Sequence, residues 1–349
     1  MNGILLADVK SNNVHGKSSG HYIPLSKNYL EIFKGERLFI AGGPIYSKYI
    51  DNEHFYELPC DSIVGRHIII NKFNVLRNCR FLFSMTDNSD IIILQHSGIS
   101  TALIGIALFA KRKNNIYVIQ YDTDSVSSFA KRIIYRFAKN KIKGIICPNK
   151  TIGNAFGLPY CEITDYIFTS DKVFNVHDFN LRKYDFSIVG TLHKDKGVIE
   201  VAKSFIGKSS SLLIAGKASE EDADELRKIA TASDNIILRL GFVSDEDYSQ
   251  YLKDSRYSIL NYSGVYFERS SGVVLDTIFS GVPVVGSRCP ALQFIEDEGI
   301  GCLYDDLNSF DFESLLSMDK HSEYMRRINN YLLTQKKYVS KLKKFIGDI

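Results

Sequence analysis

Two acidic residues stand eight positions apart in the segment YFERSSGVVLDTIFSGVPVVGS, which spans residues 266–287. Glu268 precedes a Ser-Ser-Gly turn, and Asp276 follows that turn within an apolar run that predicts a helix. Backbone N–H groups at the start of a helix have no partner inside the helix, so an anion is stabilised there. The simpler alternative is one acid that caps the helix and a second acid that faces solvent.

A second candidate lies upstream, in the segment VGTLHKDKGVIEVAKSF that begins at residue 189. Gly190 lets the backbone approach a ligand closely, because glycine has no side chain. Lys196 and Gly197 come where a helix begins, which is a suitable place for phosphate. Taken alone, the segment is equally compatible with an ordinary strand-to-helix connection that carries an exposed lysine.

Short apolar strands alternate with helix-length segments on both sides of a polar linker at residues 165–183. This alternation predicts two Rossmann-like, doubly wound parallel sheets that face each other across a cleft, with ligands at the carboxyl ends of the strands. We expect domains at 1–172 and 184–330, and a helix at 331–349 that packs back on the first domain. The predicted strands are 3–9, 37–43, 90–95, 115–121, 144–149, 184–190, 211–216, 235–242, 256–262, 282–287 and 301–306.

Composition limits the classes of protein that fit. The chain of 349 residues has 45% hydrophobic and 24% charged residues, which is typical of a globular protein with two domains. Its six cysteines form no Cys-x-x-Cys pair, which argues against a zinc site and a disulfide framework and favours reduced thiols in the cytoplasm. The apolar stretch at 91–110 is interrupted by QHSG, so we expect a strand and a helix there and no transmembrane span.

Charge is divided unevenly along the chain. Residues 1–182 contain 22 Lys and Arg against 15 Asp and Glu, whereas residues 183–349 contain 21 against 25. The basic excess gathers at 111–113 and 129–143, and the second run predicts a helix with Phe129, Ile133, Ile134 and Phe137 on one face. One interpretation packs this apolar face on the sheet and leaves the basic residues in solvent. The other places the basic face on anionic lipid at the inner side of the plasma membrane. The pattern does not favour nucleic acid.

The acidic pair belongs to a longer pattern that resembles the retaining glycosyltransferases of family 4. In that family a Glu is followed after seven residues by a second acid at the start of a helix, and Glu268 and Asp276 match, with Asp in place of the usual second Glu. VGTLHKDKG (189–197) is similar to the family's Val-Gly-Arg-Leu-x-x-x-Lys-Gly loop, and the segments at 212–230 and 237–260 follow in the family's order. The resemblance covers about 120 residues and implies a GT-B fold and retaining transfer from a nucleoside-diphosphate sugar.

The resemblance also implies a role for each matching residue. The diphosphate would rest on Lys196 and on the helix start, Asp276 would accept the ribose hydroxyls, and Glu268 would reach the donor sugar; Lys196 and Glu268 are the catalytic candidates. No metal and no cofactor besides the donor are expected. The candidate donor-binding residues are Gly190, Thr191, Lys196, Gly241, Phe242, Glu268, Ser270, Ser271, Gly272 and Asp276.

One position departs from the family pattern. Thr191 stands where the family usually has an arginine, so one of two cations for the diphosphate is missing. Threonine does not replace a bidentate arginine contact at equal strength. Lys194, Lys217 and Arg269 are the candidates that would substitute for it.

The acceptor side has weaker signals. The loop after the first strand contains Gly20 and His21, His96 ends the strand at 90–95, and Tyr121 and Asp122 end the next strand. Residues that end parallel strands lie where substrate binds, although many such residues only cap the strand. The habits of the family and the basic first half suggest a lipid-linked bacterial surface polysaccharide as acceptor, such as O-antigen, capsule or exopolysaccharide.

Two alternatives remain open at this stage. The segment YDTDS (121–125) places Asp122 and Asp124 where they would hold a metal ion in a GT-A transferase. The other alternative is a sugar-nucleotide-binding subunit without catalysis, which Thr191 suggests.

Overall fold

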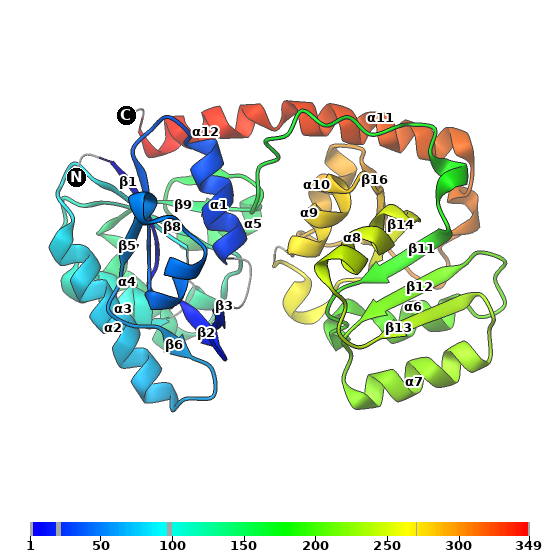
Figure 1. Ribbon diagram of the computed structural model, residues 1–349, viewed down its shortest axis with the longest axis horizontal. Coiled ribbons are helices and arrows are strands. Elements are labelled where there is room, and N and C mark those ends of the chain that lie inside the picture. The colour runs from blue at the N-terminus through cyan, green and yellow to red at the C-terminus, as the bar shows by residue number, and fades with distance from the viewer. Residues whose placement is uncertain (1–2, 19–21, 96–99, 270, 348–349) are drawn as a thin grey trace. The chain divides into compact units, whose positions relative to one another are not determined.

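A computed structural model describes residues 3–18, 22–95, 100–269 and 271–347, which form two compact units (Figure 1). Unit 1 comprises Met1–Thr169 and Lys336–Ile349, and unit 2 comprises Ser170–Gln335. The C-terminal segment expected as one helix at 331–349 is divided instead. Helix α11 (Met318–Thr334) lies in unit 2, and α12 (Lys336–Ile346) lies in unit 1.

Unit 1 is built on a seven-stranded parallel sheet in the order β10-β9-β8-β7-β1-β4-β5. Most of its strands are continuous apolar runs, because helices cover both faces of the sheet. In β1, Leu6 pairs with Ile40 of β4 and with Ile93 of β7. The strands are β1 (Ile4–Asp8), β4 (Leu38–Gly42), β5 (Phe55–Glu57), β7 (Ile91–Leu94), β8 (Asn115–Ile119), β9 (Ile142–Cys147) and β10 (Tyr160–Glu162).

The helices of unit 1 divide between the two faces of this sheet (Figure 1). On one face lie α2 (Ile68–Met85), α3 (Ser100–Phe109), α4 (Phe129–Lys139) and α5 (Lys150–Phe156). On the other lie α1 (Tyr22–Ile32) and α12. A small sheet joins β2 (Asn12–Val14), β3 (Lys17–Ser18) and β6 (Ser62–Ile63). No helix in the described ranges is both long enough and apolar enough to cross a membrane.

Helix α4 corrects one expectation from the sequence. Three of the four residues on its predicted apolar face are exposed, namely Phe129 at 79%, Ile133 at 43% and Phe137 at 71%. The helix instead buries Ala138 and Tyr135, whose hydroxyl donates a 2.8 Å hydrogen bond to a backbone carbonyl of α5. The expectation that this apolar face packs on the sheet is therefore wrong.

Unit 2 contains a six-stranded parallel sheet in the order β13-β12-β11-β14-β15-β16. Its core includes the packed rings of Phe186, Phe205 and Phe312. The strands are β11 (Tyr184–Val189), β12 (Leu212–Gly216), β13 (Ile236–Leu240), β14 (Ser255–Leu260), β15 (Val284–Ser287) and β16 (Gly301–Tyr304). The helices before α11 are α6 (Val198–Ser204), α7 (Glu220–Thr231), α8 (Asp245–Lys253), α9 (Gly272–Phe279) and α10 (Gln293–Asp297).

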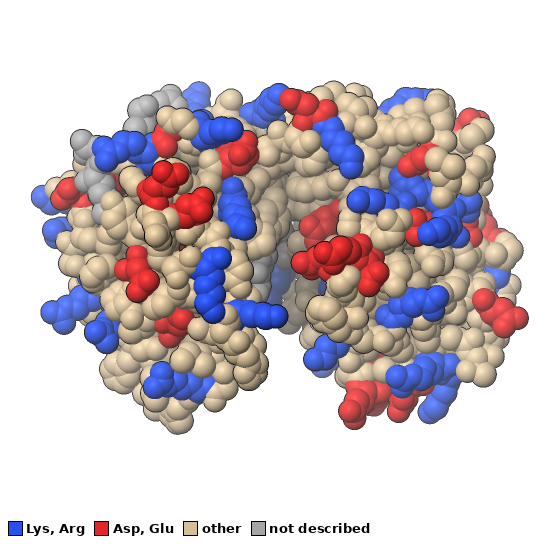
Figure 2. Space-filling model, viewed as in Figure 1, with Lys and Arg blue, Asp and Glu red and all other residues tan. Residues whose placement is uncertain are grey.

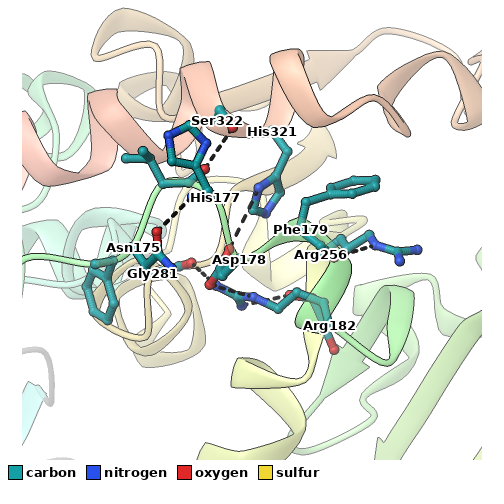
Figure 3. Close-up of polar contacts among 12 residues, drawn as sticks. Asn175, His177, Asp178, Phe179, Arg182, Arg256, Gly281, His321 and Ser322 are labelled. Carbon is teal, nitrogen blue, oxygen red and sulfur yellow. Dashed lines mark hydrogen bonds and ion pairs between the residues drawn. The ribbon is translucent and has the colours of Figure 1, made fainter.

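The start of unit 2 is fastened to α11 and to the sheet by buried polar groups (Figure 3). Arg182 donates hydrogen bonds to Asp178 and to the carbonyl oxygens of Ser255 and Gly281, the last two at 3.0 Å. His321 of α11 lies fully buried beside Asp178, with 3.9 Å between its Nδ1 and the Asp178 Oδ1. Burial lowers the pKa of His321 to about 4, and the nearby Arg182 guanidinium lowers it too. This histidine is therefore neutral at pH 7.

Candidate functional site

Three glycines form a strip without side chains at the carboxyl edge of the unit 2 sheet. Gly216 ends β12, and Gly190 and Gly241 directly follow the neighbouring strands β11 and β13. The φ angles of Gly190, Gly216 and Gly241 are +115°, +149° and +126°, which strongly favour glycine. A Cβ atom on Gly216 would lie 1.7 Å from the carbonyl oxygen of Gly190, so no other residue fits there. A Cβ atom on Gly241 would meet nothing within 4 Å, so a ligand can approach the backbone closely at this end of the strip.

Lys196 lies at the end of a 3₁₀ turn between β11 and α6. Only 7% of the residue is exposed, and its Nζ lies 5.2 Å from the centre of the Tyr266 ring. Burial lowers the pKa of this lysine to about 8. A cation held in such surroundings gains more from an anionic ligand than a lysine in solvent does, because water screens it less.

Asp195 joins the Lys196 turn to the turn that precedes Glu268. Its backbone carbonyl accepts a hydrogen bond from Ser263 N at 2.9 Å, and its carboxylate accepts one from Val265 N at 3.2 Å. Gly264 has φ +48°, and a Cβ atom there would lie 2.7 Å from the Asp195 carboxyl group. These contacts fix Lys196 relative to the chain that leads to Glu268, which is half-buried.

The start of α9 brings the second acid to the same edge of the sheet. The helix follows Ser271, which is 8% exposed, and no side-chain hydrogen bond between described residues caps its first turn. Asp276, one turn into the helix, accepts a 3.0 Å hydrogen bond from the Tyr248 hydroxyl of α8. The Asp276 side chain stays in contact with solvent, yet the protein packed around it raises the pKa of the carboxyl group, against the lowering effect of Tyr248.

Gly190 and α9 also lie close together. A Cβ atom on Gly190 would be 3.4 Å from Cγ2 of Val273 and 3.7 Å from Cε2 of Tyr248. Within unit 2 the glycine strip, the Tyr248–Asp276 pair and the start of α9 therefore share one edge of the sheet. Tyr248 and Gly216 were not predicted as site residues. Glycine at the end of three successive strands was a usable signal for Gly216, whereas the role of Tyr248 depends on how α8 packs against α9.

The remaining donor-side candidates lie at the surface of unit 2. Thr191 is exposed after Gly190, and Phe242, after Gly241, is 94% exposed. The backbone carbonyl of Lys217 accepts a 2.9 Å hydrogen bond from Leu192 N, so this exposed lysine lies beside the chain that contains Thr191. Ser270 lies outside the described residues.

The acceptor-side candidates belong to unit 1, and three of them, Gly20, His21 and His96, lie outside the described residues. Tyr121 and Asp122 follow β8. The Tyr121 ring packs against the buried cluster that contains Tyr29, and burial raises the pKa of its hydroxyl, as does nearby Asp165. Asp122 accepts a 2.9 Å hydrogen bond from the backbone N of Asp124.

Comparison with known proteins adds two findings. The family described as Glycosyl transferases group 1 matches residues 183–314, which lie in unit 2. No curated protein matches the chain by sequence.

Solved structures resemble the chain over nearly its whole length. HepE of Anabaena, in complex with UDP, has a TM-score of 0.67 and 14% identity and covers 98% of each chain. AviGT4, a glycosyltransferase involved in avilamycin A biosynthesis, has a TM-score of 0.62 and 14% identity over 99% of this chain and 96% of its own. The UDP-forming alpha,alpha-trehalose-phosphate synthase of Burkholderia xenovorans, in complex with glucose-6-phosphate, has a TM-score of 0.67 and 8% identity over 99% and 100%.

These similarities decide the fold. At such low identities they concern the fold alone, and the two parallel-sheet units agree with them. The alternative of a GT-A fold is wrong, and Asp124, on which it depended, forms a 2.6 Å ion pair with Lys131. Assignment to family 4 stays a prediction. The chain has the GT-B fold, and its match over residues 183–314 supports a glycosyltransferase of that fold.

Proposed function

We propose that the protein transfers a sugar from a nucleoside-diphosphate sugar to an acceptor hydroxyl, with retention of configuration at the anomeric carbon. The observation that carries the proposal is the arrangement at the edge of the unit 2 sheet. There a buried lysine, a helix start that no described side chain caps and a carboxylate hydrogen-bonded to a tyrosine accompany a glycine strip. Diphosphate, ribose hydroxyls and a flat base are the three parts of a nucleotide that such groups recognise.

The diphosphate is the part with the greatest charge. Lys196 supplies a poorly screened positive charge, and the first N–H groups of α9, together with its helix dipole, supply hydrogen bonds and a partial charge. Because negative charge grows on the diphosphate as the sugar leaves, these groups stabilise the transition state more than the ground state.

Glu268 and Asp276 bind different parts of the donor. Asp276 is oriented by Tyr248 and accepts hydrogen bonds from the ribose hydroxyls. Glu268 binds the donor sugar, and the backbone at Gly241 and Phe242 borders the base. The leaving phosphate itself takes the proton of the acceptor hydroxyl, so no protein base is assigned.

Lys217 is our choice for the cation that replaces the family's arginine. Its backbone is hydrogen-bonded to the segment that contains Thr191, and its side chain is exposed. We expect Lys217→Ala to weaken nucleotide binding more than Lys194→Ala does, which removes another exposed lysine and serves as the control. Isothermal titration calorimetry measures the dissociation constant of the nucleotide for both variants. Equal losses would exclude this choice.

The acceptor in this proposal is a lipid-linked bacterial surface polysaccharide. The basic excess of residues 1–182 supports it, since a lipid-linked acceptor lies at a membrane whose inner leaflet is anionic.

A nucleotide screen tests the donor site directly. UDP, GDP, ADP and CMP are compared by thermal shift, with UDP first because HepE is in complex with UDP. A nucleotide at 100 times its dissociation constant stabilises the protein by about 2.7 kcal/mol. If none of the four shifts the melting temperature, the donor-site proposal fails. Turnover of a radiolabelled donor by the chain alone then separates an enzyme from a nucleotide-binding subunit, and the anomeric configuration of the product tests retention.

A further inference from the structure

The exposed apolar residues of unit 1 gather in one part of the chain. Among the described residues of unit 1, all eleven exposed large hydrophobic side chains lie between residues 63 and 137. Those of unit 2 are spread over its length. The eleven are Ile63, Val64, Ile68, Ile69, Ile70, Phe73, Phe81, Leu108, Phe129, Ile133 and Phe137.

The topology makes these residues neighbours. Helix α3 packs against α2 on one side and against α4 on the other, so the three helices lie side by side. Each of them runs antiparallel to the parallel strands it connects, and their N-termini therefore lie at the carboxyl edge of the sheet. We name the outward surface of α2, α3 and α4, with the turn at 63–67 before α2, the α2–α4 face.

Outward stripes on two of these helices are apolar at helical spacing. On α4, Phe129, Ile133 and Phe137 follow one another at intervals of four residues, and Arg132 and Arg136 are exposed beside them. On α2, Ile69 and Phe73 form a stripe that the exposed Arg77 continues.

Basic residues predominate in and beside these helices. Residues 62–86, 100–113 and 128–143, which include α2, α3, α4 and the segments next to them, together contain thirteen Lys and Arg and no Asp or Glu. Along the lower left margin of Figure 2, where α2 lies in Figure 1, Lys and Arg stand on a surface of uncharged residues. Among the described residues, Lys131 is the one member of this basic set that forms an ion pair, with the neighbouring Asp124.

We propose that the α2–α4 face docks on an anionic lipid bilayer. Exposed Phe and Ile side chains enter the boundary between headgroups and acyl chains, while the flanking arginines and lysines bind lipid phosphates. A second copy of the chain fits this face less well, because a symmetric pair joined through it would bring the exposed basic residues of both copies, such as Arg132 and Arg136, together.

Docking in this way would place the acceptor side of unit 1 at the membrane. Asp122 precedes Phe129 by seven residues, and both lie near the carboxyl edge of the sheet. A lipid-linked acceptor would then reach Asp122 without leaving the bilayer. This last step rests on the proposed function, whereas docking itself does not.

Vesicle co-sedimentation of the full chain tests the proposal. Vesicles of equal parts phosphatidylglycerol and phosphatidylcholine are compared with vesicles of phosphatidylcholine alone, without donor or acceptor. We expect binding to the anionic vesicles only, weakening as ionic strength rises toward 0.1 M, where the screening length falls to about 10 Å. Because the assay needs no turnover, a failure here is distinguishable from a failure of the proposed function.

Two variants with matched controls locate the surface. Phe129→Ser/Ile133→Ser/Phe137→Ser is compared with Val173→Ser/Leu181→Ser/Leu333→Ser, which removes exposed apolar side chains from unit 2. We expect the first triple variant to bind anionic vesicles at least about tenfold more weakly than the parent and the second to bind within about twofold of it. Unfolding temperatures near that of the parent confirm that both are folded.

The charge variants follow the same design. Arg132→Glu/Arg136→Glu is compared with Arg227→Glu/Lys228→Glu on α7, which changes net charge equally. The first should also lose at least about tenfold in binding, and the second should stay near the parent. Absent binding to anionic vesicles, or equal binding by the parent and the first triple variant, would overturn the proposal. So would a dimer that this triple variant dissociates.

Discussion

Replacement of Lys196 by methionine separates the stability of the protein from its function. Burial lowers the pKa of Lys196 from 10.5 to about 8, so the folded protein holds this charge at a cost. One pKa unit corresponds to 1.36 kcal/mol, so the cost at pH 7 is about 3 kcal/mol. Contact between the Lys196 cation and the nearby Tyr266 ring offsets about 1 kcal/mol of this free-energy cost. Methionine has a similar length, no charge and a flexible shape, and it fills the same space.

We therefore expect Lys196→Met to raise the free energy of unfolding by about 2 kcal/mol at pH 7. The sign of the pH dependence follows from the lowered pKa. Above about pH 8 the folded parent releases a proton that the unfolded chain still holds, so the stability of the parent rises with pH. The difference in free energy of unfolding between Lys196→Met and the parent should therefore shrink above pH 8 and vanish near pH 10.5. Urea-induced unfolding at pH 7, 9 and 10.5 measures the difference, with the exposed Lys194→Met as control.

The same variant should bind nucleotide more weakly than the parent. In the proposed function the Lys196 charge meets the diphosphate, so calorimetry should show binding of UDP at least about 30-fold weaker, the effect of losing a hydrogen bond to a charged group. In the parent, binding should take up protons near pH 9, where about a tenth of the free protein still has Lys196 protonated. A variant that is less stable than the parent at pH 7 yet binds nucleotide equally well would refute this reasoning.

Three further predictions concern the acids, the metal requirement and pH. Asp276→Ala should mainly raise KM for the donor, whereas Glu268→Ala should lower kcat by about 10², so steady-state kinetics of both variants distinguish the proposed ribose and sugar contacts. Activity should survive excess EDTA, because lysine and helix N–H groups meet the diphosphate charge; full loss restored by Mn²⁺ would contradict this. His321 has its pKa lowered to about 4, so the stability present above pH 6.5 should fall by about 3 kcal/mol as the pH drops to 4. Urea unfolding of His321→Phe should show a smaller fall, and an unchanged slope would exclude His321 as the cause.

The strands of both sheets were predictable because the local sequence of a buried parallel strand is enough to identify it. Each of the eleven predicted strands is present, since a buried parallel strand is an apolar run whatever surrounds it. Short edge elements such as β5 and β10 were missed. Each has three residues, too few to show a period, and each adds to the sheet as an edge strand.

Features that depend on how helices pack were harder to predict from the sequence. The sequence marks Glu268, Asp276 and Lys196 by type and spacing, but not the 3.0 Å hydrogen bond from Tyr248, which requires α8 and α9 to be side by side. Periodicity in α4 identified the apolar stripe but not the side of the helix that the core would take. Tyr135 and Ala138 were not counted as its buried face, although a small residue and a hydrogen-bonded aromatic ring pack there well.

The exposure of single phenylalanines has a spectroscopic consequence, because the chain contains no tryptophan. Phe242→Trp would place one indole at a position that is 94% exposed beside the glycine strip, where stacking of a nucleotide base would quench its emission. Phe137→Trp would place one on α4, where entry into lipid would shift its emission to shorter wavelength. Excitation at wavelengths that the 20 tyrosines absorb weakly makes the introduced indole the main emitter in each protein, so nucleotide binding and lipid docking can be titrated separately in the same buffer.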